Sequence, residues 1–220
     1  MNLNNNQITI TPVGLTQAGH ASLYFDVARL DLLHPIVSGN KWFKLQYNLE
    51  AAHRKKCRGI VTAGGAFSNH LAATAYACKQ NGLQSAGLVR GELAVPFNHT
   101  LAFCKTQEML LEALPRSIYK STDLLQQIAA ERYPDYLFVP EGGSNEAGAR
   151  GCEQIALAIP RFDEYTHIIC AAGTGTTCRG LAAAAAAHQS IIAIPVLKIS
   201  AAEQDLFCLR QVVPVPAAQM

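Results

Sequence analysis

GIVTAGGAFSNHLAATAYACKQNG, residues 59 to 82, is an apolar run followed by a Gly-Gly turn and an alanine-rich segment that closes on a glycine. Its first six residues predict a strand, and residues 68 to 82 predict a helix with a capping residue at its start and Gly82 at its end. Similar units recur on both sides of this stretch. They predict βαβ units and a mainly parallel sheet, which is an α/β fold.

The flanking sequence extends this pattern. ITITPVG and SLYFDVARL, near the N-terminus, could form a strand pair, whereas Pro214 and Pro216 argue against regular structure after Lys198. Further strands are predicted at residues 85–91, 116–120, 136–143, 166–173 and 191–198, and further helices at residues 98–114, 122–133, 145–159 and 178–188.

Composition narrows the class of protein. A chain of 220 residues that is 50% hydrophobic can bury the core of one large domain or two small ones. A net charge of +2 without a long basic run argues against a nucleic-acid partner. The seven cysteines contain no C-x-x-C pair, so we expect reduced thiols and no metal site. With no signal peptide and no long apolar segment, the sequence predicts a cytoplasmic protein without a membrane span.

Candidate chemistry falls in the turns that follow predicted strands, where parallel α/β proteins place their sites. Gly173-Thr174-Gly175-Thr176-Thr177 could hold a phosphate at a helix N-terminus, or it could be a plain tight turn. It lacks the lysine of a Walker loop and the third glycine of a dinucleotide-binding loop, which disfavours a nucleotide-binding protein. Residues 68–70, Ser-Asn-His, and residues 141–151, EGGSNEAGARG, could either serve function or simply cap helices.

Lys41 lies in SGNKWFKL, residues 38 to 45, directly after a Gly-Asn turn. It could be an ordinary solvated lysine in the first turn of a helix. A helix N-terminus disfavours a cation, however, so this position also suits a neutral, nucleophilic amine. A phosphate loop together with a lysine that forms a Schiff base is the pair of features that pyridoxal phosphate requires.

Five ordered blocks resemble a known family. They are LLHPIVSGNKWFKLQYNL, TAGGAFSNHLAATAYAC, VRGE, VPEGGSNEAGARG and AAGTGTTCRGLAAA, within residues 8 to 198. They look like the pyridoxal-phosphate enzymes of the 1-aminocyclopropane-1-carboxylate deaminase and D-cysteine desulfhydrase family. The resemblance implies the tryptophan synthase β-like fold, fold type II, with two parallel-sheet α/β domains: an incomplete large cofactor domain, residues 1–45 plus 161–220, and a small domain, residues 46–160.

The resemblance also implies roles for individual residues. Lys41 would bind the cofactor covalently and move the proton at the substrate Cα, and Asn69 would contact the 3′-oxygen of the cofactor. Ser68 would lie beside a small amino-acid substrate, as a catalytic nucleophile or as a ligand of the substrate carboxylate, and Asn69 and His70 would bind the substrate with it. The phosphate would bind at Gly173, Thr174, Gly175, Thr176 and Thr177. The protein is expected to be a homodimer if the complete fold is present.

This sequence departs from the family pattern in three ways. Phe67 stands where the family usually has glutamine, and Phe43 stands where it usually has arginine. Whole members continue well past the equivalent of Lys198, and the part beyond it carries the partner of the cofactor ring nitrogen. The tail after Ile199 does not resemble the family, which predicts a truncated end. A catalytically impaired fragment of such an enzyme is therefore the alternative hypothesis.

Overall fold

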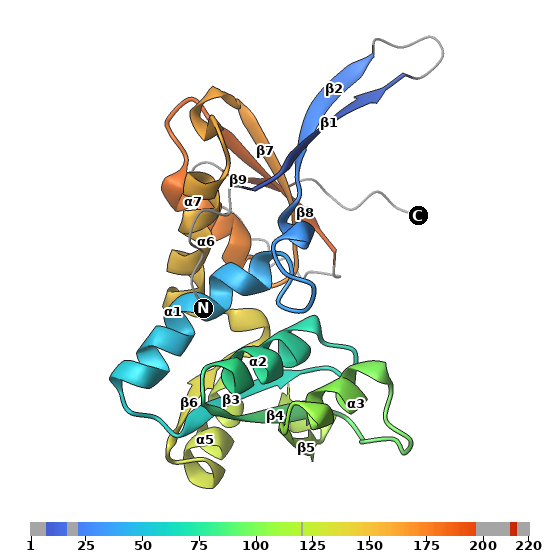
Figure 1. The fold of residues 1–220 in the computed structure, drawn as a ribbon, viewed down its shortest axis with the longest axis vertical. Helices are drawn as coiled ribbons and strands as arrows, with labels where there is room; N and C mark the ends of the chain where they lie inside the picture. The colour runs from blue at the N-terminus through green and yellow to red at the C-terminus, as the bar shows by residue number, and fades with distance from the viewer. Residues whose placement is uncertain (1–7, 17–21, 120, 197–211, 215–220) are drawn as a thin grey trace.

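The computed structural model describes residues 8–16, 22–119, 121–196 and 212–214 (Figure 1). None of the helices within these ranges is long and apolar enough to cross a membrane. The strands are β1 (Ile10–Leu15), β2 (Leu23–Ala28), β3 (Gly59–Gly64), β4 (Gln84–Arg90), β5 (Leu110–Leu114), β6 (Tyr136–Val139), β7 (His167–Ala172), β8 (Ser190–Pro195) and β9 (Val212–Pro214). The α-helices are α1 (Asn40–Arg54), α2 (Asn69–Gln80), α3 (His99–Thr106), α4 (Arg116–Tyr119), α5 (Thr122–Arg132), α6 (Glu146–Ala158) and α7 (Thr176–Ala184). Three 3-10 turns lie at Leu30–Leu32, Glu141–Gly143 and Phe162–Glu164.

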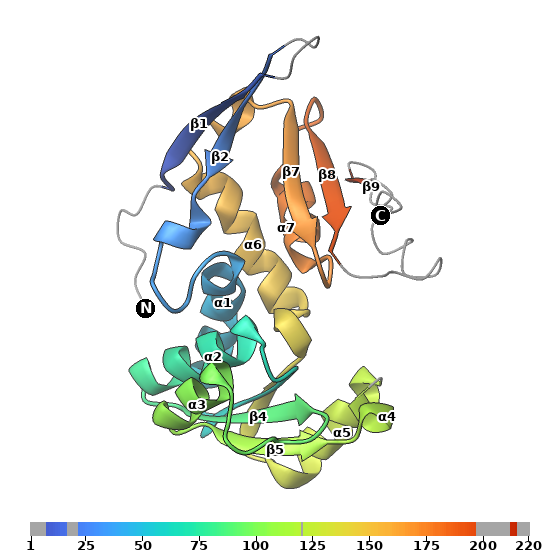
Figure 2. The same cartoon turned by 90° about the vertical axis from the view of Figure 1, so that its right-hand side faces the viewer.

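Two parallel sheets confirm the predicted α/β class. The first has the order β5-β4-β3-β6, and the second has the order β7-β8-β9. In Figure 2 the first sheet lies at the bottom of the molecule and the second near its top, with α1 and α6 between them. The antiparallel pair β1-β2, which the sequence also predicted, projects from the body as a ribbon (Figure 1).

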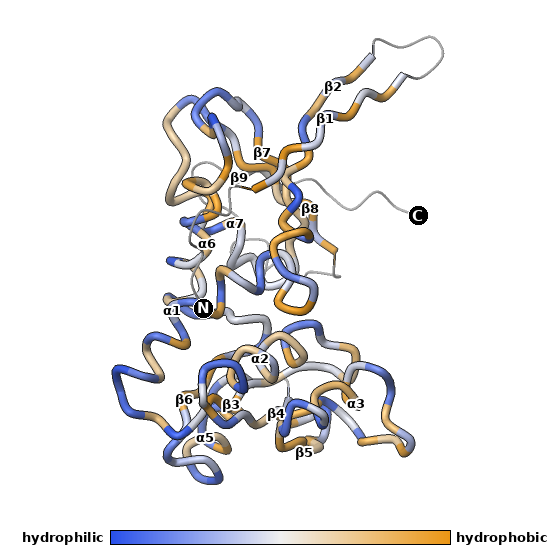
Figure 3. The backbone as a smooth tube through the Cα atoms, in the orientation of Figure 1, coloured by the Kyte–Doolittle hydropathy of each residue, from blue (hydrophilic) through white to orange (hydrophobic). Residues whose placement is uncertain are grey.

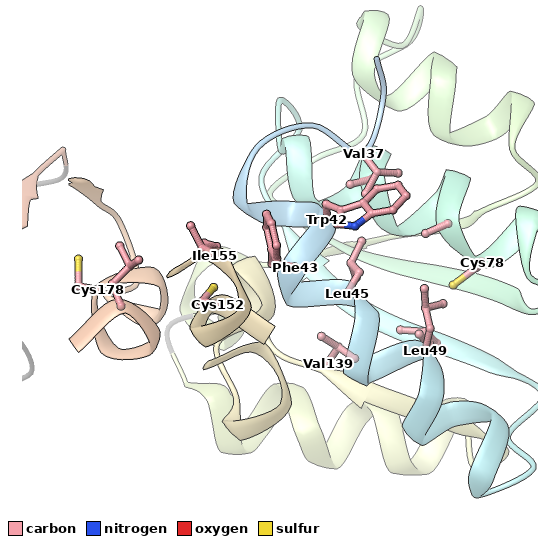
Figure 4. Close-up of a cluster of buried hydrophobic side chains, with 14 of the residues drawn as sticks. Val37, Trp42, Phe43, Leu45, Leu49, Cys78, Val139, Cys152, Ile155 and Cys178 are labelled. Atoms are coloured by element: carbon pink, nitrogen blue, oxygen red, sulfur yellow. The ribbon is translucent and has the colours of Figure 1, made fainter. Parts of the chain in front are cut away.

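One hydrophobic cluster joins the two sheets. Figure 4 shows its members gathered around α1, including Phe43, Leu45 and Leu49, with Ile155 and Cys178 from the neighbouring helices. Phe43 is 1% exposed, so the aromatic ring that replaces the arginine of the family is a core residue here. The cluster reaches Val139 in the first sheet and Ile191 in the second. The predicted domain boundary after residue 45 falls within α1.

Glycines allow α1, α6 and α7 to approach closely. A Cβ added at Gly151 in α6 would overlap the backbone carbonyl of Phe43 in α1, and a Cβ at Gly180 in α7 would overlap Cys152 in α6. Such contacts leave no space for a side chain. The glycines therefore fix how near Lys41, at the start of α1, lies to the loop that precedes α7.

Two stretches differ from the prediction. The helix predicted over residues 98–114 ends at Thr106, because Glu108 adopts a left-handed conformation with φ 65° and reverses the chain. Residues 110–114 then pair with β4 as the strand β5. The strand predicted at residues 116–120 is instead the short helix α4 at residues 116–119, and residue 120 lies outside the described ranges.

The end of the chain differs as well. Residues 212–214 form β9, which pairs in parallel with β8, although Pro214 was expected to prevent regular structure. A proline is tolerated at the edge of a sheet, where its missing N–H costs no ladder hydrogen bond. The prediction of irregular structure after Lys198 was therefore wrong at these three residues.

Candidate active site

Three of the four predicted loops meet at one place. The start of α1, the loop after β6 and the start of α7 contact one another through side chains. Asn40 Nδ2 donates a 2.7 Å hydrogen bond to Thr177 Oγ1, and Thr176 Oγ1 donates a 3.1 Å bond to Ser144 Oγ. These bonds connect residues that are 137 and 32 positions apart in the chain. The fold therefore assembles a polar centre from separate segments.

Lys41 lies at this centre, in the first turn of α1. Its Nζ donates a 2.8 Å hydrogen bond to Asn40 Oδ1, so Asn40 bridges the amine and Thr177. Gly39, the residue before the helix, has φ 65°, which a residue with a side chain rarely adopts. Burial lowers the pKa of Lys41, and the Cys152 thiol opposes this effect. The amine is therefore neutral more often than that of a solvated lysine.

Residues 173–177 form the turn between β7 and α7, with two threonines in the first positions of the helix. Gly175 precedes α7 with φ 72°, in the left-handed conformation that glycine favours. Thr176 and Thr177 are buried polar residues, and Thr176 Oγ1 lies 3.0 Å from Thr174 Oγ1. The first N–H groups of a helix have no acceptor within the helix. Several donors therefore gather at the start of α7, with the favourable end of the helix dipole.

Lys44 is a site residue that the sequence reasoning left without a role. It is 3% exposed, and its Nζ donates a 3.0 Å hydrogen bond to the carbonyl of Gly142. A Cβ on Gly142 would lie 3.2 Å from Thr174 Cγ2, so this ammonium lies near the 173–177 loop. Burial, followed by the charge of Lys41, lowers the pKa of Lys44 to about 8. The i, i+3 spacing from Lys41 was the signal that could have identified it.

The Ser-Asn-His segment starts α2. Ser68 Oγ accepts a 3.3 Å hydrogen bond from the Leu71 N–H, which confirms the capping interpretation. Asn69 is exposed at the start of the helix. Nothing in the described part of the chain joins Ser68 or Asn69 to Lys41 by a hydrogen bond. Their predicted contacts with substrate and cofactor stay predictions.

His70 is buried beneath this segment. The Thr62 hydroxyl donates to the carbonyl of Val139 at 2.7 Å, so it accepts from His70 Nε2–H at 3.0 Å. This network assigns the proton to Nε2. Burial and the nearby lysines lower the pKa of His70 to about 3, which keeps the ring neutral. A direct contact between His70 and a substrate stays a prediction, and the geometry supports a positioning role.

The loop after β6 caps α6. Asn145 Oδ1 accepts a 2.8 Å hydrogen bond from the Gly148 N–H, which confirms the capped-helix alternative for residues 141–151. The Asn145 side chain also donates to Asn48 Oδ1 at 2.8 Å, which attaches the loop to α1. Ser144 additionally contacts Thr176. The segment is a cap that also holds the polar centre together.

One thiol lies against the polar centre, and two more contact each other near the start of α7. Cys152 Sγ lies 4.0 Å from Thr177 Oγ1, and the Sγ atoms of Cys170 and Cys178 lie 3.2 Å apart. Burial raises the pKa of Cys152, so this thiol stays protonated near neutral pH. Residues 8–16, 22–119, 121–196 and 212–214 hold no cluster of three metal-ligating side chains that could bind an ion.

A family model described as pyridoxal-phosphate-dependent enzyme matches residues 9–214. The chain belongs to this family. The match extends beyond Ile199, so the prediction that the tail lacks family resemblance was wrong up to residue 214. Enzymes of the family use pyridoxal phosphate. They are α/β proteins with parallel sheets, which agrees with the fold described above.

Individual relatives agree with the resemblance seen in the sequence. The chain is 30% identical over 188 residues to a provisionally named 1-aminocyclopropane-1-carboxylate deaminase of Thermotoga maritima, covering 82% of this chain and 60% of that protein. It is 29% identical over 169 residues to the D-cysteine desulfhydrase of Serratia proteamaculans, covering 71% and 51%. The chain thus spans about half to three fifths of the length of these relatives.

Solved structures show the same fold. A crystal structure of a homologue of 1-aminocyclopropane-1-carboxylate deaminase superposes with a TM-score of 0.72 at 25% identity, covering 84% of this chain and 58% of that one. An O-ureido-L-serine synthase superposes with a TM-score of 0.63 at 16% identity, covering 86% and 61%. At that lower identity the likeness concerns the fold alone.

The residues present fit the cofactor of this family. Pyridoxal phosphate needs an amine for its aldehyde and an anion site for its phosphate. Lys41 provides a half-buried amine whose pKa is lowered. The 173–177 turn and the buried Lys44 ammonium are the groups that would hold the phosphate, and Asn40 lies between Lys41 and this turn.

Proposed function

We propose that this chain is a pyridoxal-phosphate-dependent lyase or deaminase that acts on a small amino acid. The two candidate reactions are conversion of D-cysteine to sulfide, pyruvate and ammonia, and conversion of 1-aminocyclopropane-1-carboxylate to 2-oxobutanoate and ammonia. The names of the relatives support both reactions. The observation that carries the proposal is the Asn40 bridge between Lys41 and Thr177, because the proposed amine and the proposed phosphate-binding turn then lie two hydrogen bonds apart.

Lys41 would have two tasks. Its amine would attach to the cofactor aldehyde, which needs a neutral nucleophile, and the lowered pKa supplies more of that form. 1-Aminocyclopropane-1-carboxylate has no hydrogen on its Cα, so with that substrate the Lys41 amine would move a proton at a ring methylene. With D-cysteine it would take the proton from the substrate Cα. Pyridoxal phosphate, when bound, supplies an electron sink for the negative charge left at that carbon. Asn40 would orient the lysine through its 2.8 Å hydrogen bond.

The other predicted residues would hold the reacting groups. Residues 173–177 would bind the phosphate through hydroxyl and backbone N–H groups, and Lys44 would offset part of its charge. Asn69, exposed at the start of α2, would contact the 3′-oxygen of the cofactor. Ser68 would bind the substrate with the lone pair and O–H that its capping bond leaves available. His70 would position β3 and the end of β6 through Thr62.

The assembly around this site is also part of the proposal. A large cofactor domain would comprise residues 1–45 and 161–220, with a small domain at residues 46–160. We expect a cytoplasmic protein that binds a small amino-acid substrate and that forms a homodimer if the complete fold is present. The alternative function, a catalytically impaired fragment of such an enzyme, would bind the cofactor without turnover.

The decisive experiment is to reconstitute the 220-residue chain with pyridoxal phosphate and compare it with Lys41→Ala. The wild type should develop the visible absorbance band of lysine-linked cofactor, and K41A should lack it. Lys55→Ala, at an exposed lysine after α1, is the matched control and should keep the band. A wild type that stays colourless would contradict the proposed cofactor site.

Turnover then separates the two candidate functions. Sulfide release from D-cysteine and 2-oxobutanoate release from 1-aminocyclopropane-1-carboxylate should be measured on the same loaded protein. Release of either product supports the enzyme and identifies its reaction. A visible band that depends on Lys41, without either product, would support the impaired fragment.

A further inference from the structure

A free guanidinium lies at the carboxyl edge of the first sheet. Arg90 is the last residue of β4 and is exposed. Its Cζ lies 5.4 Å from the centroid of the Tyr119 ring, in a cation–π contact. Within the described residues it has neither an ion-pair partner nor a hydrogen-bond acceptor. Its charge is therefore available to a ligand.

Arg90 also lies beside the segment that carries Ser68. Gly64 in β3 pairs with Val89 in β4, so Arg90 follows at the level of Gly65. Its Nη2 lies 3.4 Å from the point that a Cβ on Gly65 would occupy. A Cβ on Gly64, the last residue of β3, would lie 2.7 Å from Ser68 Oγ, so Ser68 lies directly over the end of β3. The guanidinium and the proposed substrate serine thus border one short loop.

Tyr119 provides a second, independent observation. The residue is 7% exposed, and its hydroxyl faces the Glu141 carboxylate, although no acceptor in the described ranges meets the geometry of a hydrogen bond to it. A ligand acceptor would compete with that carboxylate. A buried polar group without a well-formed hydrogen bond is costly, and a ligand acceptor of good geometry would remove that cost. Burial, and then the nearby Glu141 carboxylate, raise the pKa of this hydroxyl, so it remains a donor.

The surrounding charges favour an anion of modest size. Arg116, at the start of α4, places its Nε 3.9 Å from the point that a Cβ on Gly91 would occupy. It adds a second guanidinium at the carboxyl ends of β4 and β5, which end beside α4 in Figure 2. Two acidic residues are nearby: Glu141 lies close to Tyr119, and Glu92 follows Arg90 by two positions in the chain. Both weaken the attraction of the site for an anion, and neither pairs with Arg90 within the described residues. Parallel α/β sheets bind ligands at this edge.

We propose that Arg90 and Tyr119 form a subsite for an anionic side-chain group of the amino-acid substrate. The inference rests on the proposed function, because it takes Lys41 and Ser68 to handle the amine and α-carboxylate. A guanidinium and a phenol O–H offer a carboxylate or thiolate charge-assisted hydrogen bonds. The subsite would favour amino acids whose side chain carries an anion, or leaves as one, over those with a neutral hydrocarbon side chain. Of the two candidate reactions, it favours the D-cysteine type.

The test compares D-aspartate with D-alanine as binding probes, since they share every group except the side-chain carboxylate. Dissociation constants should be obtained from ligand-dependent melting temperatures of the full chain, with and without pyridoxal phosphate. The variants are Arg90→Gln and Tyr119→Phe, with Arg54→Gln as the control at an exposed arginine at the end of α1. Loading of the cofactor is read separately from the visible band.

We expect wild type and R54Q to bind D-aspartate about tenfold more tightly than D-alanine, as one charged hydrogen bond predicts. R90Q should bind both equally, and Y119F should show a smaller preference than wild type. Equal binding by the wild type, or a preference that persists in R90Q, would overturn the subsite. A preference without the visible band would refute the proposed cofactor site and support the subsite. A visible band without a preference for D-aspartate would support the proposed cofactor site and refute the subsite.

Discussion

Lys44 is a buried charge whose ionisation should be visible in the stability of the protein. Its pKa falls to about 8 on folding, mainly through burial, against about 10.4 in an unfolded chain. Between these two values the unfolded chain holds more protons at this group than the folded chain does. The free energy of unfolding should therefore rise with pH across this window, by about 3 kcal/mol from this residue. Below pH 8 both states are protonated, and the cost of burying the charge is fully present.

Lys44→Met isolates that contribution, because other titrating groups are common to both proteins. The free energy of unfolding in urea should be measured from pH 7.5 to 10.5 for wild type and K44M. The wild type should gain about 3 kcal/mol relative to K44M over this range. Lys55→Met, at an exposed lysine, should follow the wild-type curve. Parallel curves for wild type and K44M would show that Lys44 is not held in a low-polarity environment.

At the scale of helices, the contact between α1 and α6 fixes the position of Lys41. Replacing a helical glycine by alanine usually stabilises a helix by about 0.5–1 kcal/mol. Gly151→Ala should do the opposite and destabilise the protein by about 1–3 kcal/mol, because the new methyl group would overlap the carbonyl of Phe43. Relief of this overlap would push α1 away from α6, and this movement should also weaken cofactor loading at Lys41.

Urea unfolding and the visible band measure these two effects of G151A. Leu157→Ala is the control on the same helix, since Leu157 is 80% exposed and its loss should change stability by less than about 0.5 kcal/mol. If G151A is as stable as wild type and loads cofactor equally, the close helix contact does not position the site.

The sequence allowed prediction of those parts of the site that depend on local order. A turn after a parallel strand lies at the carboxyl edge of the sheet wherever the strand sits, so the loops at residues 64–70, 140–145 and 173–177 could be located. The contact of Asn40 with Thr177 spans 137 positions and depends on how α1, α6 and α7 pack. The Arg90–Tyr119 contact likewise depends on the order of β4 and β5 and on α4. No periodicity in the sequence reports such packing.

The helix predicted at residues 98–114 is confirmed as far as Thr106 and is wrong beyond it. Its leucines and glutamates suit a helix, and nothing in their spacing reveals the left-handed turn at Glu108. Pairing with β4 then makes residues 110–114 a strand. Tertiary hydrogen bonding outweighs helix propensity here, because propensity differences are only tenths of a kcal/mol per residue.

At the scale of the whole molecule, the second sheet has one covered and one open face. Ile191 and Ala193 of β8 are buried in the central cluster. On the other face, Ile169 of β7 is 62% exposed and Ile194 of β8 is 42% exposed. Ile169 pairs with Ile192, and Ala171 pairs with Ile194, so their side chains share that face. Both strands are coloured as hydrophobic segments in Figure 3.

An open apolar face of this kind should drive self-association of the 220-residue chain, because contact between two such faces removes apolar surface from water. Replacing both Ile169 and Ile194 by threonine keeps the β-branched shape that suits a strand and adds a polar group. The double variant should remain monomeric at protein concentrations where the wild type associates in sedimentation velocity, with a similar melting temperature.

Leu157→Thr, at an exposed leucine on α6, should associate like the wild type. If the double variant associates as strongly as the wild type, the association surface does not include Ile169 and Ile194. The projecting β1-β2 ribbon, where Tyr24 is 77% exposed, would then be the next surface to alter.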